Sequence, residues 1–292
     1  MSEPAVEPVG FIGLGAMGRP MALNLHNKGA DLVVHDIDPK CVAALGELGA
    51  EIASSPAALA KKAAVVFTML PDLPDVEDVL FGEDGVLGAK RNDLLVVNCS
   101  TMSPIKSREL GERLADVGVR YLEAPVTRGT SGAIAGTLCF LVGGAADDLE
   151  EVRSSLEAMG TTIYHCGAAG DGMAMKIVNN ANTLVHCAAL TETIAMGRKW
   201  GLNDDMMREL LTEGSADCYA VRMKLPKLIE GDFAPGFTID LAHKDLGVAL
   251  EFAAGLGTTL PVVESARGRM AEGRARDKGG RDTMALVELY ED

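Results

Sequence analysis

The stretch VGFIGLGAMG, residues 9–18, constrains the fold of this chain more than any other feature. Glycines at positions 13, 15 and 18 follow the apolar run VGFI and precede a helical pattern over 20–29. Glycines with this spacing at a strand-to-helix join let backbone N–H groups approach a pyrophosphate, and they occur in sheets of parallel strands. Alone, the motif is equally compatible with an ordinary glycine turn, so its surroundings have to decide.

The second apolar run, DLVVHD, ends at Asp36, at the distance from Gly18 where a ribose-binding carboxylate belongs. This carboxylate would repel the 2′-phosphate of NADP, and no Arg stands beside it, although Lys40 is close. The loop and the acidic residue together predict a dinucleotide site that prefers NAD to NADP. The loop residues expected to bind the cofactor are Gly13, Gly15, Ala16, Met17 and Gly18.

Two different sequence patterns divide the chain. Up to residue 167, short β-branched runs alternate with helical segments, which is typical of an α/β fold with a Rossmann-type, doubly wound sheet. From 168 to 292 the pattern is helical and begins with one long helix over about 172–196. We expect a dinucleotide-binding domain at 1–167, an all-α domain at 168–292, and a ligand site in the cleft between them. Strands are expected at 9–13, 31–36, 65–70, 94–99, 120–126, 138–144 and 162–166.

Composition and charge exclude several classes of function. The chain has 27 basic and 42 acidic residues, and its net charge of −15 argues against nucleic acid as a partner. No apolar run reaches the ~18 residues of a membrane span, and the first ten residues are unlike a secretory peptide. The six cysteines are scattered without a metal-binding spacing, as in reduced proteins. We therefore expect a cytoplasmic protein with no membrane partner and no metal site.

Five stretches, in this order and spacing, resemble the β-hydroxyacid dehydrogenases, a family that includes 3-hydroxyisobutyrate dehydrogenase and tartronate semialdehyde reductase. They are GFIGLGAMGRPMALNL, NCSTMSP, EAPVTRGTSGAIAGTL, GDGMAMKIVNNANTL and FTIDLAHKDL, and the likeness extends from residue 9 to about 285. It implies an NAD(H)-dependent oxidoreductase that interconverts a short-chain 3-hydroxyacid and its semialdehyde. The substrate would thus be a small anion. It also implies a homodimer or homotetramer, in which the helical domain serves substrate binding and oligomerisation.

The resemblance assigns the catalytic role to Lys176, in the stretch KIVNN. Hydride transfer to a carbonyl leaves negative charge on the oxygen, and a lysine ammonium supplies both positive charge and a proton there. On a helix, Asn180 and Thr183 share a face with this lysine, and Asn179 lies beside them. The resemblance makes Asn180 a substrate ligand. Taken alone, most lysines on helices are solvated surface charges, and the alternative for Asn180 is a surface amide.

Further residues of the expected site lie at the ends of predicted strands and on a later helix. Ser100 and Thr101 match a pair that meets the substrate carboxylate, and Thr101 is also expected to contact the cofactor. These two residues could equally cap the helix that follows. Lys244 matches a lysine near the nicotinamide end of the cofactor, and its alternative is a salt bridge with Asp245 or Asp240. The loop expected against the cofactor contains Leu70 and Pro71.

The substrate loop departs from the family pattern. Members that act on 3-hydroxyisobutyrate typically have APVSGG, whereas residues 124–129 of this chain are APVTRG. Arg128, followed by Gly129, would place a five-donor cation at the substrate tail, where it suits a second anionic group such as carboxylate, sulfonate or phosphate. Its alternative is an arginine that points to solvent or pairs with the cofactor diphosphate. With an arginine at this position the loop resembles that of the 3-sulfolactaldehyde reductases. On this interpretation, the residues around the sulfonate would be Arg128, Asn179, Asn180 and Thr183.

Other substrates and one other class of function stay open at this stage. The glycines of TRGTSGA stand where 3-sulfolactaldehyde reductases have bulkier residues, so tartronate, methylmalonate and succinic semialdehydes, or a sugar acid such as threonate, remain candidates. A catalytically silent dinucleotide-binding module is the alternative from a different class. The presence of Lys176 argues against that alternative.

Overall fold

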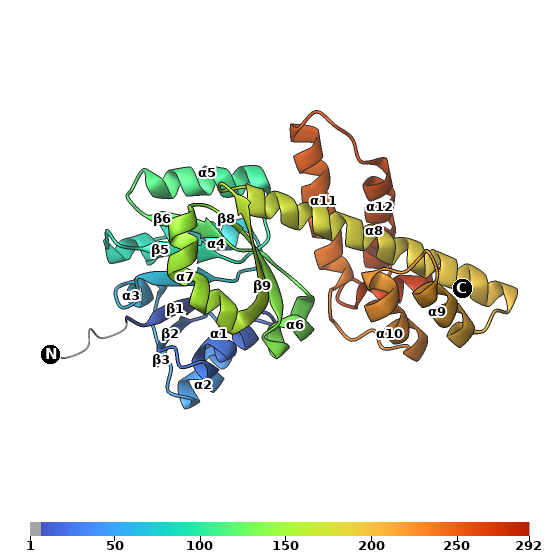
Figure 1. Ribbon diagram of the computed structural model, residues 1–292, viewed down its shortest axis with the longest axis horizontal. Coiled ribbons are helices and arrows are strands. Elements are labelled where there is room, and N and C mark those ends of the chain that lie inside the picture. Colours follow the sequence, from blue (N-terminus) through green and yellow to red (C-terminus); the bar gives the residue numbers. More distant parts are fainter. Residues whose placement is uncertain (1–6, 292) are drawn as a thin grey trace. The chain divides into compact units, whose positions relative to one another are not determined.

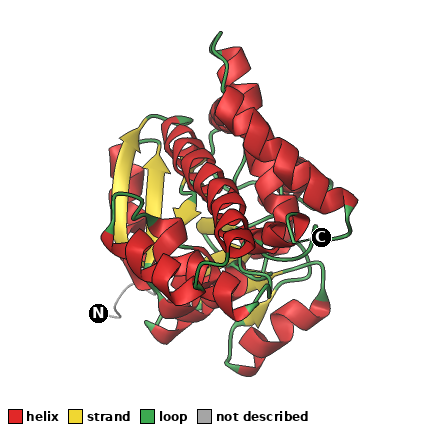
Figure 2. Cartoon of the chain, turned by 90° about the vertical axis from the view of Figure 1, so that its right-hand side faces the viewer, coloured by secondary structure: helices red, strands yellow, loops and turns green. Residues whose placement is uncertain are grey.

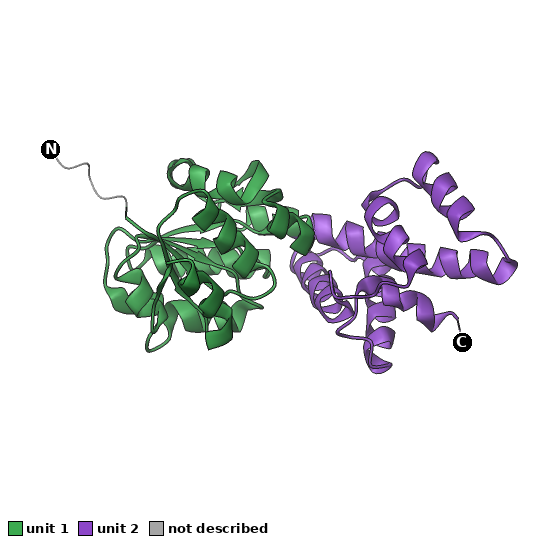
Figure 3. Ribbon diagram, turned by 90° about the horizontal axis from the view of Figure 1, so that it is seen from below, with its two compact units in different colours: residues 1–176 green, residues 177–292 purple. Residues whose placement is uncertain are grey.

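The computed structural model describes residues 7–291, which divide into two compact units. One unit ends at Lys176 and the other begins at Ile177 (Figure 3). The division falls inside a single long helix, and each unit has its own buried core.

The described part of the first unit is built on one sheet of nine strands. The strand order is β3-β2-β1-β4-β5-β6-β8-β7, and β9 pairs with β8. Strands β1 to β6 are parallel, whereas β8 runs antiparallel to β6 and β7. This confirms the predicted Rossmann-type sheet. The strands are β1 (Val9–Ile12), β2 (Leu32–His35), β3 (Glu51–Ile52), β4 (Val65–Thr68), β5 (Leu95–Asn98), β6 (Arg120–Glu123), β7 (Val126–Thr127), β8 (Leu138–Gly143) and β9 (Gly160–Gly167).

Two details differ from the predicted strands. The run expected over 120–126 divides into β6 and β7 around Pro125, because proline has no N–H to donate to a sheet. Strand β3 was not predicted, because a two-residue edge strand whose residues are both exposed is too short to produce an alternating pattern. The other expected strands are present, with ends that differ by one or two residues.

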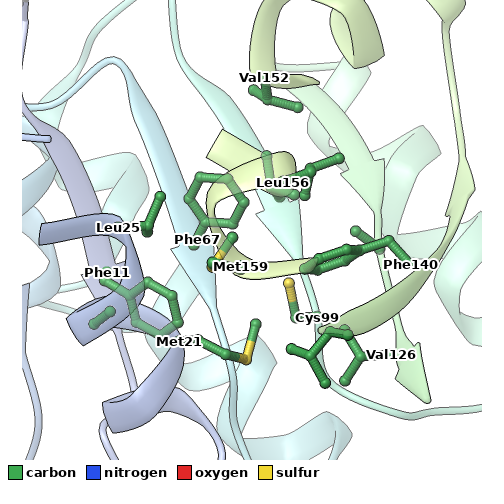
Figure 4. Close-up of a cluster of buried hydrophobic side chains, with 14 of the residues drawn as sticks. Phe11, Met21, Leu25, Phe67, Cys99, Val126, Phe140, Val152, Leu156 and Met159 are labelled. Atoms are coloured by element: carbon green, nitrogen blue, oxygen red, sulfur yellow. The ribbon is translucent and has the colours of Figure 1, made fainter. Parts of the chain in front are cut away.

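Helices cover both faces of the sheet, as expected for a doubly wound fold (Figure 1). On one face, Leu25 of α1 and Leu156 of α7 pack against Phe11 and Phe67 (Figure 4). On the other face, helices α3, α4 and α5 pack against strand residues such as Val96. The helices of this unit are α1 (Gly18–Asn27), α2 (Pro39–Glu47), α3 (Pro56–Ala60), α4 (Leu73–Phe81), α5 (Pro104–Ala115), α6 (Gly129–Ala135) and α7 (Ala146–Met159).

The second unit, as far as it is described, consists of helices and connecting loops, which confirms the predicted all-α part (Figure 2). One core joins α8, α11 and α12, and a second joins α8, α9 and α10. Short π-helical and 3-10 turns cover 220–224 and 283–289. The α-helices are α8 (Asp171–Trp200), α9 (Asp204–Glu213), α10 (Leu225–Glu230), α11 (Ile239–Gly255) and α12 (Pro261–Ala275).

Helix α8 continues beyond the end that the sequence predicts. It passes through Gly197, directly after the predicted end at about residue 196, and ends at Trp200. A Cβ atom at Gly197 would lie 2.4 Å from the sulfur of Met207. The glycine therefore lets α9 pack closely against α8 and does not end the helix.

Candidate functional site

The glycine loop after β1 has two tightly packed glycines and one open glycine. Gly13 has a φ of +91°, and a Cβ atom there would lie 2.3 Å from the carbonyl oxygen of Met69. A Cβ atom at Gly18 would lie 1.8 Å from the oxygen of Gly13. At Gly15, nothing lies within 4 Å of the Cβ position, and Gly15 and Ala16 are exposed. The loop thus presents open backbone at the start of α1, as an anion at a helix N-terminus requires.

Asp36 lies at the end of β2 and is held against this loop. Its Oδ2 accepts a hydrogen bond from the backbone N–H of Leu14 at 2.6 Å, and its Oδ1 accepts one from Asp38 at 2.8 Å. Each carboxylate oxygen has a second lone pair for a hydroxyl donor. The loop, with the half-buried Met17 before α1, and the oriented carboxylate therefore fit the pyrophosphate and ribose of a dinucleotide.

The loops after β4 and β5 are joined by Ser100, which is 1% exposed. Its Oγ accepts a hydrogen bond from the N–H of Leu70 at 2.9 Å, so its hydroxyl hydrogen is still available to donate. A Cβ atom at Gly13 would lie 2.9 Å from Leu70 Cδ2, which places this leucine against the glycine loop. Thr101 is half-buried and Pro71 is exposed. Within the first unit, Ser100 thus holds the loop expected to lie along the cofactor.

A chain of buried polar side chains lies behind these loops, and we did not predict it from the sequence. Asn98 Nδ2 donates to the hydroxyl of Tyr121 at 3.2 Å, and that hydroxyl lies 2.9 Å from Ser107 Oγ. Ser107 in turn donates to Glu123, which is completely buried. Glu123 Oε1 accepts the backbone N–H of Met173 at 3.0 Å, in the first turn of α8. The available clue was a charged residue, Glu123, inside the predicted strand over 120–126.

Burial raises the pKa of the Glu123 carboxyl, and the hydrogen bonds from Ser107 and Met173 offset part of that rise. Two glycines surround this carboxyl closely. A Cβ atom at Gly143 would lie 2.4 Å from its Oε1, and one at Gly172 would lie 3.1 Å from the same atom. The carboxyl group is therefore tightly enclosed where α8 begins.

Lys176 lies in the second turn of α8 and is 7% exposed. Its Nζ donates a hydrogen bond to the carbonyl oxygen of Val126, in β7, at 2.7 Å. The helix neighbours Met173 and Ile177 are buried. A buried ammonium is costly unless hydrogen bonds compensate its lost hydration, so this lysine is an unusual group that the fold holds in one place.

Asn180 lies one turn later on α8 and is also 7% exposed. Its Nδ2 donates to Oδ2 of Asp245, on α11, at 2.7 Å, and its Oδ1 accepts from Asn179 Nδ2 at 3.2 Å. These bonds fix the orientation of the amide and leave it one N–H for a ligand. Thr183, one further turn along, donates to the backbone oxygen of Asn179 at 2.9 Å.

Asp245 is 5% exposed, and the sequence suggested it only as a salt-bridge partner for Lys244. The structure pairs it with Asn180, while Asp240, the other aspartate of that helix stretch, accepts from Arg274 at 2.6 Å. Lys244 is half-buried on α11. The motif HKDL therefore contains a second functional candidate beside its lysine.

Arg128 has a left-handed backbone, with a φ of +86°, and its side chain is exposed. Its guanidinium donates to the carbonyl oxygen of Thr137 at 2.6 Å, to Thr161 Oγ1 at 2.8 Å and to Thr162 Oγ1 at 3.1 Å. Gly129 follows it as the first residue of α6, with a φ of +63°. Three of the five N–H donors thus bond to the chain itself, and recognition of a substrate anion stays a prediction.

The described residues were also compared with the requirements of a metal site, a membrane helix and a reactive cysteine. Within residues 7–291, no group of three or more His, Cys, Asp or Glu residues is arranged to hold a metal ion, and no helix is long and apolar enough to cross a membrane. The thiols of Cys99 and Cys187 are buried, and burial raises the pKa of both thiols, that of Cys187 to about 12. Cys99 therefore packs at the end of β5 and is not an activated nucleophile.

Comparison with known protein families covers nearly the whole chain. Residues 8–167 match the NAD binding domain of 6-phosphogluconate dehydrogenase, and residues 170–290 match the NAD-binding domain of NADP-dependent 3-hydroxyisobutyrate dehydrogenase. These matches confirm the dinucleotide cofactor predicted from the glycine loop. The choice between NAD and NADP is a separate question, because the second family description names NADP.

Individual proteins give the same picture. The 2-(hydroxymethyl)glutarate dehydrogenase of Eubacterium barkeri is 39% identical over 284 residues, which cover 97% of this chain and 94% of the relative. The 3-sulfolactaldehyde reductase of Escherichia coli strain K12 is 36% identical over 281 residues, which cover 96% and 94%. The solved structure of Mycobacterium tuberculosis 3-hydroxyisobutyrate dehydrogenase with L-serine has a TM-score of 0.89 and 33% identity, covering 98% of this chain and 100% of that one.

Proposed function

This chain belongs to the β-hydroxyacid dehydrogenases, NAD(P)-dependent oxidoreductases that act on hydroxyl groups, and from this premise we propose that it interconverts a short-chain 3-hydroxyacid and its semialdehyde. The observation that carries the proposal is the buried ammonium of Lys176, held by the carbonyl oxygen of Val126 and followed one turn later by the oriented amide of Asn180. A silent binding module has no need for such a group.

The chemistry is divided between the cofactor and the side chains of the chain. When bound, the nicotinamide supplies or accepts a hydride at the carbon atom of the substrate. Lys176 gives its proton to the substrate oxygen during aldehyde reduction and takes it back during alcohol oxidation. Its positive charge stabilises the negative charge that develops on that oxygen. Asn180 uses its remaining N–H to orient the substrate, and Thr101 with the Ser100 hydroxyl receives the carboxylate.

Replacing Lys176 by glutamine tests this assignment. The variant keeps a polar side chain that can donate hydrogen bonds but has no acidic proton to transfer, and general acid–base groups contribute about 10²–10⁴-fold to rate. We expect kcat to fall by that factor, while the Kd for NADH, measured by nucleotide fluorescence, changes by less than about twofold. Lys199→Gln, at an exposed position of the same helix, is the matched control and should keep full turnover. Near-normal aldehyde reduction by Lys176→Gln would remove the proposal.

We further propose that NAD(H) is preferred to NADP(H), because the fixed carboxylate of Asp36 would repel a 2′-phosphate. Asp36→Ala removes this repulsion and one ribose contact. We expect the ratio of kcat/KM for NADH over NADPH to fall at least tenfold, chiefly through the KM for NADH. An unchanged ratio would show that other residues select the cofactor.

The proposed substrate class is a short-chain aldehyde acid with an anionic tail. One relative is named for 2-(hydroxymethyl)glutarate, which carries two carboxylates, and another for 3-sulfolactaldehyde, which carries a sulfonate. Arg128 retains two N–H donors that make no bond to Thr137, Thr161 or Thr162, and a guanidinium suits either anion. Tartronate, methylmalonate and succinic semialdehydes and sugar acids such as threonate are the alternatives that a substrate panel would separate.

We also propose a homodimeric or homotetrameric assembly and a cytoplasmic location. The six cysteines, all in the described residues, are unpaired in the structure, which suits a reducing compartment. Molecular mass in solution and the distribution of the protein between cell fractions test these two properties directly.

A further inference from the structure

Two hydrogen bonds join the first turns of α8 to one short segment of the first unit. Glu123 Oε1 accepts the backbone N–H of Met173 at 3.0 Å. Three residues further along both elements, the carbonyl oxygen of Val126 accepts from Nζ of Lys176 at 2.7 Å. The segment between the two acceptors contains Pro125, whose ring fixes its backbone angle φ. The two acceptors therefore form a stiff pair of attachment points for one turn of the helix.

Glu123 caps α8 from a distant part of the chain. The first N–H groups of an α-helix have no partner within the helix, and a side chain directly before the helix usually accepts from them. Here the acceptor comes from β6, and the backbone N–H groups of Gly170 and Gly172 also bond to it. Asp171, the first residue of α8, accepts instead from the N–H of Ala168, at 2.9 Å. A local cap fixes a helix only to its own chain, whereas this cap fixes the start of α8 to the sheet.

The backbone around the carboxyl group leaves the start of α8 little room. A Cβ atom at Gly172 would clash with the carbonyl oxygen of Leu141 and would lie 2.9 Å from the backbone nitrogen of Gly143, both in β8. The side chain of Met173 is completely buried. Apolar contacts hold a helix against a sheet but have no direction, whereas the hydrogen bond to Glu123 is directional and opposes rotation of the helix. The first turn of α8 is therefore fixed in both depth and rotation.

The same carboxyl group ends a chain of hydrogen bonds that begins at Ser100. Asn98 Oδ1 accepts the backbone N–H of Ser100 at 3.0 Å, and its Nδ2 donates to the hydroxyl of Tyr121. Ser107 links that hydroxyl to Glu123. All five residues are buried, so the bonds are protected from competition with bulk water. One buried chain thus holds both the loop proposed to receive the substrate carboxylate and the helix turn of the proposed proton donor.

We propose that Glu123 is a positioning residue for the reaction, which fixes the first turn of α8 so that the ammonium of Lys176 reaches the substrate oxygen. A proton donor has to lie within hydrogen-bond distance of that oxygen, and a misplacement of about 1 Å can cost about 10²-fold in rate. Glu123 is completely buried, so it acts through Lys176 and not on the substrate. The inference rests on the proposed role of Lys176 and explains what keeps this side chain in place.

Two substitutions of similar size separate the acceptor oxygen of Glu123 from its charge. Glu123→Gln and Glu123→Met both remove the charge, but only glutamine keeps an oxygen that can accept the N–H of Met173. We expect Glu123→Met to lower kcat about tenfold or more, while KM and the Kd for NADH stay within about twofold of the wild-type values. Glu123→Gln should restore near-normal kcat. The assay uses NADH and the semialdehyde, among those named above, that the wild type reduces fastest.

Asp171→Ala is the matched control, because it removes a carboxylate at the same end of α8 whose side chain is 44% exposed. It should keep full turnover. Equal kcat in Glu123→Met and Glu123→Gln, or an equal loss in Asp171→Ala, would overturn the proposal.

A double variant decides whether Glu123 acts through Lys176. Effects of residues that act as one unit do not add, so Glu123→Met combined with Lys176→Gln should have the kcat of Lys176→Gln alone. If the two losses multiply, Glu123 acts by another route and the inference is wrong. Normal turnover in Lys176→Gln alone would refute the proposed function as well. A loss in Lys176→Gln beside normal turnover in Glu123→Met would refute only this inference.

Hydrogen exchange follows the bond itself and needs no substrate. The Met173 amide should exchange about tenfold faster in Glu123→Met than in the wild type, and at the wild-type rate in Glu123→Gln. Ser107→Ala is the milder variant for use if Glu123→Met does not fold, because it removes only the hydroxyl that donates to Glu123. It should change exchange and kcat in the same directions by smaller factors. Wild-type exchange of the Met173 amide in Glu123→Met, or wild-type kcat in Ser107→Ala, would overturn the proposal.

Discussion

The two sides of α8 reverse, at a few positions, the distribution of side chains that surface helices usually have. Lys176 and Asn180 are each 7% exposed, whereas Val178, Met196 and Trp200 are more than half exposed. Polar groups are stable in the interior of a protein when hydrogen bonds replace those they made to water. Large apolar side chains that are grouped on the surface often mark a site of interaction. The inward polar residues therefore point to chemistry, whereas the outward apolar residues pack against nothing within the second unit. Reading either side by ordinary amphipathicity would have missed both.

After the replacement of Lys176, we expect the largest effect on the inward side of α8 from breaking the hydrogen bond between Asn180 and Asp245. Asp245→Ala leaves a buried amide without its partner, which costs about 1–3 kcal/mol of unfolding free energy. KM should rise more than kcat falls, because Asn180 orients the substrate. Urea unfolding and steady-state kinetics give both values.

Asp240→Ala is the matched control for that variant. Asp240 is on the same helix, and its salt bridge with Arg274 is about half exposed at both ends. Such surface pairs are worth about 0–1 kcal/mol. If both aspartates cost the same stability and leave KM unchanged, the buried bond has no special part in substrate binding.

Arg128 tests the opposite case, a charged group that is exposed and still expected to bind substrate. Glycine tolerates the φ of +86° at this position, so Arg128→Gly removes the guanidinium without backbone strain. A lost charged hydrogen bond is worth about tenfold in binding or more. The test uses 2-formylglutarate, the aldehyde that corresponds to 2-(hydroxymethyl)glutarate, and the KM for it should rise by about that factor. The KM for methylmalonate semialdehyde, which lacks the second carboxylate, should change little.

A clamp between β8 and β9 is the competing explanation for Arg128. The double variant Thr161→Val and Thr162→Val removes two of its intramolecular partners and keeps the guanidinium. If this variant reproduces the kinetic effect of Arg128→Gly on both aldehydes, the arginine acts through the fold and not on the substrate tail.

The smallest effect concerns Glu123, which lies where α8 begins. Its folded pKa is raised, so its contribution to stability is complete below the usual value of about 4.3 and is lost as pH rises through the raised folded value. Glu123→Gln does not titrate. The difference in unfolding free energy between the two proteins should change in the variant's favour by up to about 1.4 kcal/mol per pH unit across that window. Urea unfolding from pH 4 to 8 measures it, and parallel curves would contradict a titrating buried carboxyl.

Much of the first unit was predictable because its decisive residues are close in sequence. The loop from Gly13 to Gly18, Asp36 at the next strand end and the apolar strand runs all occur with short, regular spacings. The structure explains these positions by local packing. For example, a Cβ atom at Gly18 would lie only 1.8 Å from the carbonyl oxygen of Gly13, so only glycine fits there. Residue type and spacing are sufficient for such features because only neighbouring residues are involved.

The remaining parts of the candidate site depend on contacts between residues that are far apart in the chain. Asp245 lies 65 positions from Asn180, Glu123 lies 50 from Met173, and Arg128 bonds to Thr162 at 34 positions. No periodicity relates such pairs, because each bond forms only when two separately folded elements pack together.

The sequence by itself therefore determined the fold class, the dinucleotide loop and the family of the reaction, because these depend on local patterns and on motifs in order. Only the tertiary structure decided that Lys176 bonds to Val126, that Asn180 bonds to Asp245, and which residues of α8 are exposed. The physical reason is that the sequence of a helix fixes which side chains share a face, whereas packing against other elements decides which face is buried.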